Sequence, residues 1–348
     1  MKRIVICADG TWNLRDQKDK KTGKRRPTNV TKVARAITPR TVAGVDQVVF
    51  YHDGVGTGGL ADKLTGGAFG AGIENNIRNL YRSIVYNYVP GDELYFFGFS
   101  RGAFTVRTLV GFLNLIGLVE KDDDYFVPDL YECYEKGWKP GSPQWLVAHR
   151  KITNIRPCPP IRFVGVWDTV GALGAPGFIG KVASLSNQNK YDYHDVALHD
   201  TVENAYQALA IDERRTPFKP DLWVRPDNWR GTLEQGWFPG VHSNVGGGYT
   251  PDGLANNALH WIVDKAKTLG LEVDDVYLAP FQAHFDAFLH NSMSLKYRVF
   301  GAYDRPIGDG KNDGQFIHPA TIGRWTKVQP PYRPVMLKKY FERTGTTP

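Results

Sequence analysis

The chain has 348 residues, of which 42% are hydrophobic and 13% aromatic, so it holds enough apolar material for one large α/β domain or two smaller ones. A mean hydropathy of −0.37, with no apolar run near the ~20 residues of a membrane span, argues against a membrane-spanning protein.

The expected compartment follows from the N-terminus and the cysteines. The apolar run after Met1 is too short for the core of a Sec signal peptide. The cysteines, Cys7, Cys133 and Cys158, have neither disulfide nor metal-ligand spacing. We therefore expect a protein that is cytoplasmic as synthesised, and any export would use a signal-independent secretion system.

The net charge of +7 is concentrated in the segment 15–35. Such a surplus suits nucleic acid, anionic lipid or phosphate. No signature of a DNA- or RNA-binding fold accompanies it. We interpret the segment as a solvated loop or mobile insert and expect no nucleic-acid partner, while contact with a membrane surface stays open.

Strand-like and helix-like patterns alternate along the chain. "RIVIC" and "QVVFY" predict strands, residues 71–89 have apolar positions at helical spacing, and "ELYFFGF" predicts a third, buried strand. The later predicted elements are a helix over 100–119, a strand over 161–168, a helix over 200–213 and a fifth strand within 233–243. This order predicts an α/β fold with a mostly parallel sheet between helices, and ligands gather at the carboxyl ends of such strands.

Two segments interrupt the alternation. Residues 120–160 and 172–200 are rich in Pro, Gly, Asp and Tyr and have weaker periodicity. We interpret them as lid-like insertions over the sheet edge, which leaves residues 1–348 as a single domain.

A serine stands between two glycines where the third strand meets the next helix. Gly98-Phe99-Ser100-Arg101-Gly102 matches G-x-S-x-G in the strand-to-helix context of a nucleophile elbow. Glycine at 98 and 102 permits the tight turn, and the backbone N–H of Arg101 would form half of an oxyanion hole. The competing interpretation is that Ser100 only caps the helix.

A serine nucleophile needs a base, and His242 is the best placed histidine. It follows a strand-like run and opens the glycine-rich turn "HSNVGGGY", in which Gly246 would free the backbone to bring the imidazole over the sheet edge. Structural roles are expected for the other histidines, namely His52, His149, His194, His199, His260, His284, His290 and His318.

Asp168 is the predicted acid because it ends the apolar strand "IRFVGVWD". It would accept the imidazole N–H and stabilise the imidazolium. Asp212 and Glu213 are rivals, but they close a predicted helix, where an ion pair with a neighbouring arginine is the ordinary explanation.

The loop after the first strand, "ADGTWN", should supply the second oxyanion donor, from the backbone N–H of Gly10 or Thr11. Asp9 is predicted to anchor this loop by accepting backbone N–H groups. The glycines of "GVGTGG", residues 54–59, match a dinucleotide pattern but lack its acidic partner, so we interpret them as a loop near the active site. No metal site and no cofactor are predicted.

Six blocks of the sequence occur in the same order in a known family, and they are "ADGTWN", "HDGVGTGG", "FFGFSRGAF", "VGVWDTVGA", "ALAIDERRTPF" and "WFPGVHSNVGGGY". From residue 4 to about 265 they resemble the DUF2235 family, the α/β-hydrolase domain of Tle1-like phospholipase effectors of bacterial type VI secretion. "HPATIGRW" is a weaker tail block. The resemblance implies an α/β-hydrolase-like fold and a Ser-Asp-His hydrolase, carried onto Ser100, Asp168 and His242, that releases a fatty acid from a glycerophospholipid without a metal in the chemical step.

The chain departs from the family in the loop of the predicted base. The family usually has aspartate where this chain has Asn244. Its effectors also carry a large extra region for membrane engagement or delivery, for which 348 residues leave no room. The sequence therefore predicts hydrolysis of a lipid, phospholipid or other acyl ester. The alternative is a non-catalytic or partner-regulated binding module on a hydrolase scaffold, and an immunity or regulatory partner leaves no readable mark.

Overall fold

The structure is a computed structural model that describes residues 1–348 except 12, 20–21, 55–65, 172–197, 299–300, 309–312 and 347. Its centre is a parallel sheet of seven described strands in the order β2-β1-β3-β6-β7-β8-β9. Their bounds are β1 Lys2–Ala8, β2 Asp46–His52, β3 Glu93–Phe99, β6 Ile161–Trp167, β7 Asn204–Ala210, β8 Thr232–Phe238 and β9 Gln315–Ile317. The predicted α/β fold with a mostly parallel sheet between helices is confirmed.

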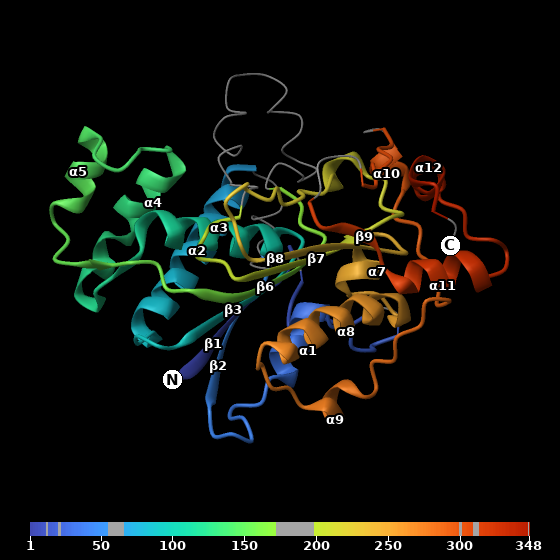
Figure 1. Ribbon diagram of the computed structural model, residues 1–348, viewed down its shortest axis with the longest axis horizontal. Coiled ribbons are helices and arrows are strands. Elements are labelled where there is room, and N and C mark those ends of the chain that lie inside the picture. The colour runs from blue at the N-terminus through green and yellow to red at the C-terminus, as the bar shows by residue number, and fades with distance from the viewer. Residues whose placement is uncertain are drawn as a thin grey trace.

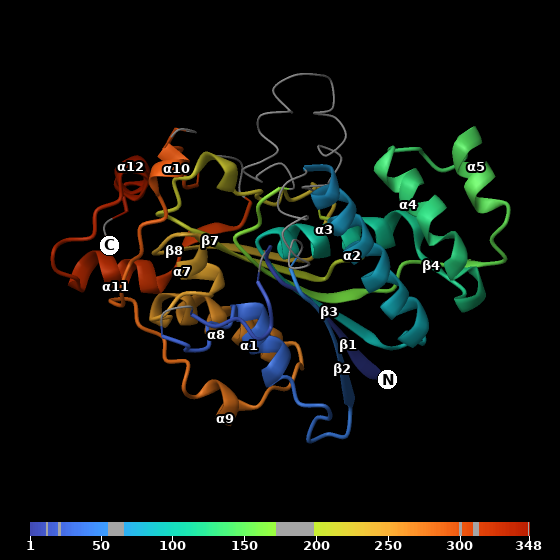
Figure 2. The ribbon, with the colours of Figure 1, turned by 180° about the vertical axis from the view of Figure 1, so that it is seen from behind.

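Helices cover both faces of the sheet (Figures 1 and 2). One face carries α2 Gly66–Asn87 and α3 Arg101–Ile116, and the other carries α1 Asn29–Ala36, α8 Gly253–Thr268 and α9 Asp275–Leu278. The strands feed both cores by alternation, as in β3, where Leu94 and Phe96 pack with α2 and α3 while Tyr95 and Phe97 pack toward α1 and α8. Hydrophobic burial on both faces thus fixes the register of the strands.

The helix predicted over residues 200–213 is wrong, because β7 occupies 204–210. Its sequence, NAYQALA, is rich in residues with good helix propensity. The strand is buried on both faces, so it lacks the polar alternation that marks a half-exposed strand. Gln207 is fully buried and bonds Gln235 of β8 through its side chain at 2.9 Å. Tertiary pairing therefore overrides the local preference.

The segment 120–160 forms a small helical unit beside α3 (Figure 1). It contains η2 Lys121–Phe126, α4 Val127–Glu135, α5 Pro143–His149 and the strand β5 Ile155–Arg156, which pairs with β4 Leu118–Val119. Val127 and Leu130 join the same core as α2 and α3. The second predicted insertion, 172–200, lies outside the described residues except for its last three.

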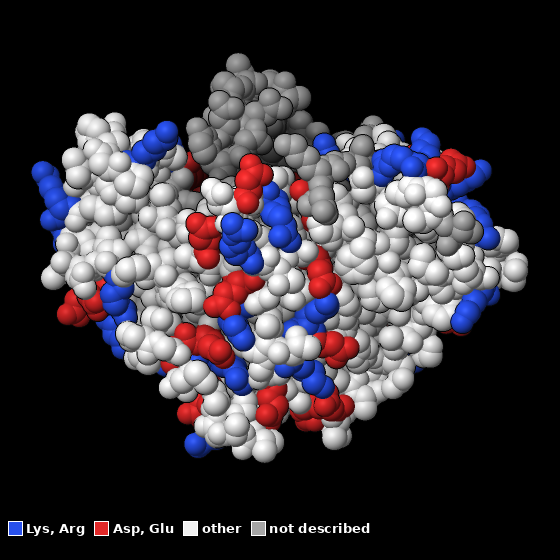
Figure 3. Space-filling view, viewed as in Figure 1, with Lys and Arg blue, Asp and Glu red and all other residues white. Residues whose placement is uncertain are grey.

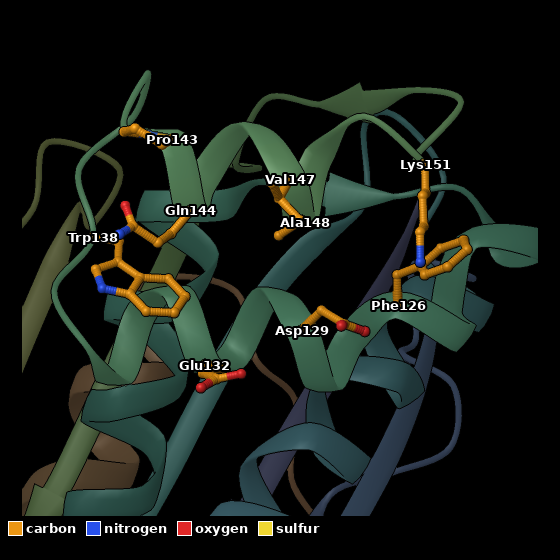
Figure 4. A pocket seen from close by; sticks show the side chains of 9 residues that line it. All are labelled: Phe126, Asp129, Glu132, Trp138, Pro143, Gln144, Val147, Ala148 and Lys151. Atoms are coloured by element: carbon orange, nitrogen blue, oxygen red, sulfur yellow. The ribbon is translucent and has the colours of Figure 1, made fainter.

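A groove of about 360 Å³ lies between α4 and α5. Asp129 and Glu132 of α4 form its floor, and Val147 and Ala148 of α5 stand opposite them (Figure 4). The groove is remote from the predicted base, because α4 and α5 lie at one end of the molecule, whereas α7, His242–Gly246, lies near its middle (Figure 1).

The C-terminal part of the chain covers the β7–β9 end of the sheet. It includes α10 Leu295–Arg298, α11 Pro319–Lys327 and α12 Val335–Thr344. A third apolar cluster holds it in place, and its buried members are Leu209, Ile211, Trp237, Ile307, Leu337 and Phe341.

The basic segment 15–35 is only partly the solvated loop that its composition predicts. Arg15 pairs with Asp53, and α1 begins at Asn29. Lys32 is fully buried and donates to Asp252 at 2.7 Å and Asn256 at 2.6 Å. On the face shown in Figure 3, basic side chains lie among acidic ones across the middle of the molecule, so no single basic patch forms there. In the part of the chain that the structure describes, no helix has the length and apolar character needed to cross a membrane.

Candidate active site

Two strained residues stand side by side where β3 and β6 end. Phe99 pairs with Trp167 in the sheet, so the residues that follow them, Ser100 and Asp168, leave it at the same level. The Ser100 N–H donates to the Trp167 carbonyl at 2.9 Å. Among the described residues other than glycine, these two have positive φ, 58° for Ser100 and 44° for Asp168. Such backbone conformations are uncommon outside glycine and cluster at functional sites.

The turn at Ser100 depends on its glycines. A Cβ on Gly98 would lie 2.6 Å from Cα of Ala103, and one on Gly102 would lie 2.1 Å from the carbonyl oxygen of Ala8. Ser100 occupies the N-cap of α3, but its side chain makes no capping hydrogen bond. The geometry is therefore that of a tight strand-to-helix turn and not of an ordinary serine cap.

His242 and Asp168 meet above the sheet. Nδ1 of His242 lies 2.6 Å from Oδ2 of Asp168, and both side chains are buried. The ring of Phe99, the residue before Ser100, lies 4.6 Å from the imidazole between centroids. A Cβ on Gly246 would lie 1.9 Å from that Phe99 ring, which explains the glycine in the turn. The fold thus brings the residues that follow β3 and β6 and the first residue of α7 to one rim.

Arg305 is a member of the site that the sequence did not reveal. Its Nη1 donates to Oδ1 of Asp168 at 2.6 Å and its Nη2 to Oδ2 at 3.0 Å. Burial alone would raise the pKa of Asp168, but the Arg305 guanidinium and the His242 hydrogen bond outweigh it and hold that pKa well below its usual range. Asp168 is therefore ionised. No motif surrounds Arg305, so the pattern of the sequence offers no signal for it.

A second ion pair borders His242. Glu213 accepts from the backbone N–H of His242 at 3.2 Å and pairs with Arg215 at 2.8 Å. The predicted ion pair of this acid is present, although it lies in a loop after β7 and not at a helix end. Burial lowers the pKa of His242, Asp168 opposes that shift, and Arg215 adds to it, so the net pKa lies below the usual 6.5.

The other rival acid, Asp212, has different partners. Its carboxylate accepts from the Gly240 N–H and from the Tyr332 hydroxyl, each at 2.7 Å. It supports the loop before His242, while Asp168 holds the imidazole.

The loop after β1 is anchored by Asp9. Its carboxylate accepts from the Gly10 N–H at 2.7 Å, and also from the hydroxyls of Thr28 and Tyr51 at 2.5 and 2.7 Å. An ideal Cβ on Gly10 would lie 3.1 Å from Cβ of Ser100, so this loop runs directly beside the elbow. The hydroxyl oxygen of Thr11 is buried and has no hydrogen-bond partner among the residues that the structure describes.

The other residues predicted to belong to the site are Arg101, Asn244 and the glycines of the "GVGTGG" loop. Arg101 is buried at the start of α3, and burial lowers its pKa to about 9. Oδ1 of Asn244 accepts from the backbone N–H of His290 at 3.1 Å, and Nδ2 of Asn244 donates to the ring Nδ1 of the same histidine at 3.2 Å. Of the "GVGTGG" loop only Gly54 lies within the described residues, where a Cβ would come 1.7 Å from the Gly10 carbonyl oxygen.

The described residues include no group of three or more His, Cys, Asp or Glu side chains arranged to hold a metal ion. The groups that meet at this rim are the His242 imidazole and the Asp168 carboxylate, with Ser100 at the end of the neighbouring strand.

A comparison with known families shows to which family the chain belongs. The catalytic domain of Tle1-like phospholipase effectors of type VI secretion matches residues 2–265, well over half of the sequence. The chain belongs to this family. The resemblance predicted from the six sequence blocks is confirmed.

The chain is also similar to part of a longer yeast protein. It is 26% identical to the uncharacterised Saccharomyces cerevisiae protein YEL023C over 240 residues, which is 63% of this chain and 32% of that protein. It therefore spans about a third of this relative's length.

Two solved structures align with the chain. An uncharacterised protein from Pseudomonas aeruginosa aligns with a TM-score of 0.54 at 18% identity, over 82% of this chain and 49% of that one. A Tle1 effector bound to the VgrG spike of the type VI secretion system aligns with a TM-score of 0.40 at 18% identity, over 71% of this chain and 51% of that one. The first supports the α/β fold, and this chain covers about half of either structure.

Proposed function

We propose that the protein is a serine ester hydrolase in which Ser100 is the nucleophile, His242 the general base and Asp168 the acid that orients it. The observation that carries the proposal is the 2.6 Å contact between His242 and Asp168, on the rim where Ser100 holds its strained turn. Ser100 and Asp168 directly follow β3 and β6, and His242 begins the helix after β8. Their order along the chain, Ser, Asp, His, is the one expected of a nucleophile-elbow hydrolase.

In the first half of the reaction the Ser100 hydroxyl attacks the ester carbonyl and its proton passes to Nε2 of His242. Asp168 accepts the Nδ1–H, so the neutral imidazole has its free lone pair on Nε2. The tetrahedral intermediate collapses, the alcohol leaves with the proton from the imidazolium, and the acyl group stays on Ser100. In the second half His242 takes a proton from water, the resulting hydroxide attacks the acyl carbonyl, and the bond to Ser100 breaks. The imidazolium returns its proton to the Ser100 oxygen as the carboxylic acid leaves.

The negative oxygen of the intermediate needs two donors. The Arg101 N–H lies at the start of α3, where the helix dipole favours negative charge. The Gly10 N–H is already directed at Asp9, which favours Thr11 as the second donor. The buried Thr11 hydroxyl adds a polar group beside this N–H.

We infer that the substrate is a lipid or phospholipid acyl ester, because the family to which the chain belongs is described as phospholipase effectors. The same description supports export by a type VI system, and contact with the surface of a membrane follows from such a substrate. The proposed chemistry requires no cofactor.

A lipid and ester panel tests the proposal. Purified protein and the Ser100→Ala variant are compared on short p-nitrophenyl esters and on phospholipid vesicles, with released fatty acid as the readout. We expect hydrolysis by the parent protein and none above background by the variant at equal folded content. Equal rates for the two proteins would refute the assignment of Ser100, and a folded parent protein that is inactive on every ester would favour the binding-module alternative.

A further inference from the structure

Arg305 lies beyond residues 2–265, the part of the chain that matches the family. It nevertheless reaches the predicted acid with a two-point contact, Nη1 to Oδ1 at 2.6 Å and Nη2 to Oδ2 at 3.0 Å, and both side chains have no solvent exposure. A planar guanidinium that meets a carboxylate in this way fixes the orientation of the carboxylate as well as its charge.

The guanidinium is itself held in place. Its Nη1 donates to the Ala210 carbonyl at 2.8 Å and its Nη2 to the Phe218 carbonyl at 2.6 Å. Two residues further along, Ile307 is buried in the C-terminal cluster, and its carbonyl accepts from Arg343 of α12 at 2.7 Å. The position of Arg305 is therefore set by the sheet on one side and by the C-terminal helix on the other.

Oδ2 of Asp168 serves two donors at once, Nδ1 of His242 and Nη2 of Arg305. Oδ1 receives the other guanidinium N–H and the Ala210 N–H, the latter at 2.9 Å. The carboxylate is thus fully hydrogen-bonded and cannot rotate away from the imidazole without losing a buried ion pair.

We propose that Arg305 is a positioning residue of the active site, which aims the Asp168 carboxylate at His242 and shares its negative charge. The inference rests on the proposed function of these two residues. Arg305 would keep the Asp168 carboxylate ionised and oriented. Because its positive charge partly offsets the negative charge of the carboxylate, Asp168 stabilises the imidazolium of His242 less. His242 therefore stays neutral to a lower pH.

The charges around His242 determine in which direction its pKa changes when Arg305 is removed. Glu213 accepts from its backbone N–H, and Arg215 neutralises Glu213. The carboxylates of Asp168 and Glu213 are thus balanced by the guanidinium groups of Arg305 and Arg215. Removing Arg305 leaves one negative charge in excess beside the imidazole, which must raise the pKa of His242.

The test compares Arg305→Gln, which removes the charge, with Arg305→Lys, which keeps the charge but loses the planar two-point contact. Arg324→Gln is the matched control, because Arg324 is also a buried arginine of the C-terminal part and donates to the carbonyls of Phe285 and Ala287. The pKa of His242 is measured by NMR titration of the imidazole, assigned with His242→Gln, and turnover is measured against pH on a p-nitrophenyl ester.

For Arg305→Gln we expect the His242 pKa to rise by ~1 pH unit, with the acid limb of kcat/KM moving by the same amount. For Arg305→Lys we expect little change in that pKa and a fall in kcat of up to about a hundredfold, the scale of a misplaced catalytic group. Arg324→Gln should lower the melting temperature and leave the His242 pKa alone. An unmoved His242 pKa in Arg305→Gln, or wild-type kcat in Arg305→Lys, would overturn the proposal.

The NMR titration keeps this inference separate from the proposed function. If the parent protein hydrolyses no ester, the serine hydrolase assignment fails, while a raised His242 pKa in Arg305→Gln still supports the electrostatic role of Arg305. If Arg305→Gln does not fold, the test depends on Arg305→Lys. A lowered kcat with a nearly unchanged His242 pKa then supports the proposal, and a wild-type kcat overturns it.

Discussion

The two parts of the chain contribute to the rim in different ways. Residues up to about 265 match the family and carry Ser100, Asp168 and His242. Ser100 and Asp168 directly follow strands and have strained backbone, and His242 begins α7 after β8. The part that follows carries only the weaker block "HPATIGRW", and it contributes Arg305, which lies outside that block, through ordinary packing on the cluster that includes Ile307 and Leu337. The difference teaches that reacting groups leave local signatures in a sequence, whereas the residue that orients one of them need not.

The largest effect is expected at the nucleophile. Ser100→Ala removes the attacking hydroxyl, and loss of a triad member lowers kcat by about a millionfold in the best studied case. Stability should change little, because the Ser100 side chain makes no capping bond. Ester turnover and thermal melting of the two proteins provide the check. Residual activity within tenfold of the parent would show that the motif-bearing part is not the catalytic one.

Asp168→Asn comes next. The amide would keep the shape but would favour the wrong tautomer of His242, and the comparable change in a serine protease lowers kcat by about ten thousandfold. Since Arg305 would then face a neutral group, stability should also fall, by about 3–5 kcal/mol for a broken buried pair. The experiment combines kcat with chemical denaturation, and an active, equally stable Asp168→Asn protein would contradict the assigned acid.

The pH dependence sharpens the comparison without a mutation. His242 must be neutral to accept the proton, and burial holds its pKa below 6.5. We therefore expect kcat/KM to be constant at neutral and mildly alkaline pH, with an acid limb centred below pH 6.5. The profile is recorded with a soluble ester at constant ionic strength. An acid limb centred well above 6.5 would mean that the charges around His242 are not arranged as described.

A smaller effect is expected from substitutions in the C-terminal cluster, which test whether Ile307 positions Arg305. Ile307→Ala and Leu337→Ala each empty a buried site of that cluster, and each should cost about 2–5 kcal/mol of stability. Only Ile307→Ala should also shift the acid limb, because this residue lies two positions from Arg305. Chemical denaturation and the pH profile of kcat/KM are measured for both variants. Identical pH profiles of the two variants would show that the position of Arg305 does not depend on Ile307.

The smallest effect is expected from Asn244→Asp, which restores the residue that the family usually has. Asn244 donates to Nδ1 of His290, whereas an aspartate can only accept there, so His290 would have to carry a proton on that nitrogen. We expect a raised pKa of His290 in an NMR titration and less than a tenfold change in kcat/KM. A large gain in activity would instead mean that Asn244 restrains the enzyme.

The sequence predicted the parts of the fold in which local and tertiary preferences agree. The strands at 93–99 and 161–167, with the residues that end them, follow from continuous apolar runs beside glycine. The strand β7 was missed because its alanines and Gln207 favour a helix until neighbouring strands pair with them on both sides. Arg305 could not be predicted, because its contact with Asp168 spans 137 positions of sequence and is set by the packing of Ile307.

The most direct test of the central claim is labelling with a fluorophosphonate, which reacts with an activated serine and not with an ordinary one. The parent protein, Ser100→Ala and His242→Gln are labelled across pH 5–8 and the modified peptide is mapped. We predict one label per chain on Ser100, at a rate that falls as His242 becomes protonated, and none at this position in either variant. A folded parent protein that takes no label, or takes it at another residue, would contradict the account.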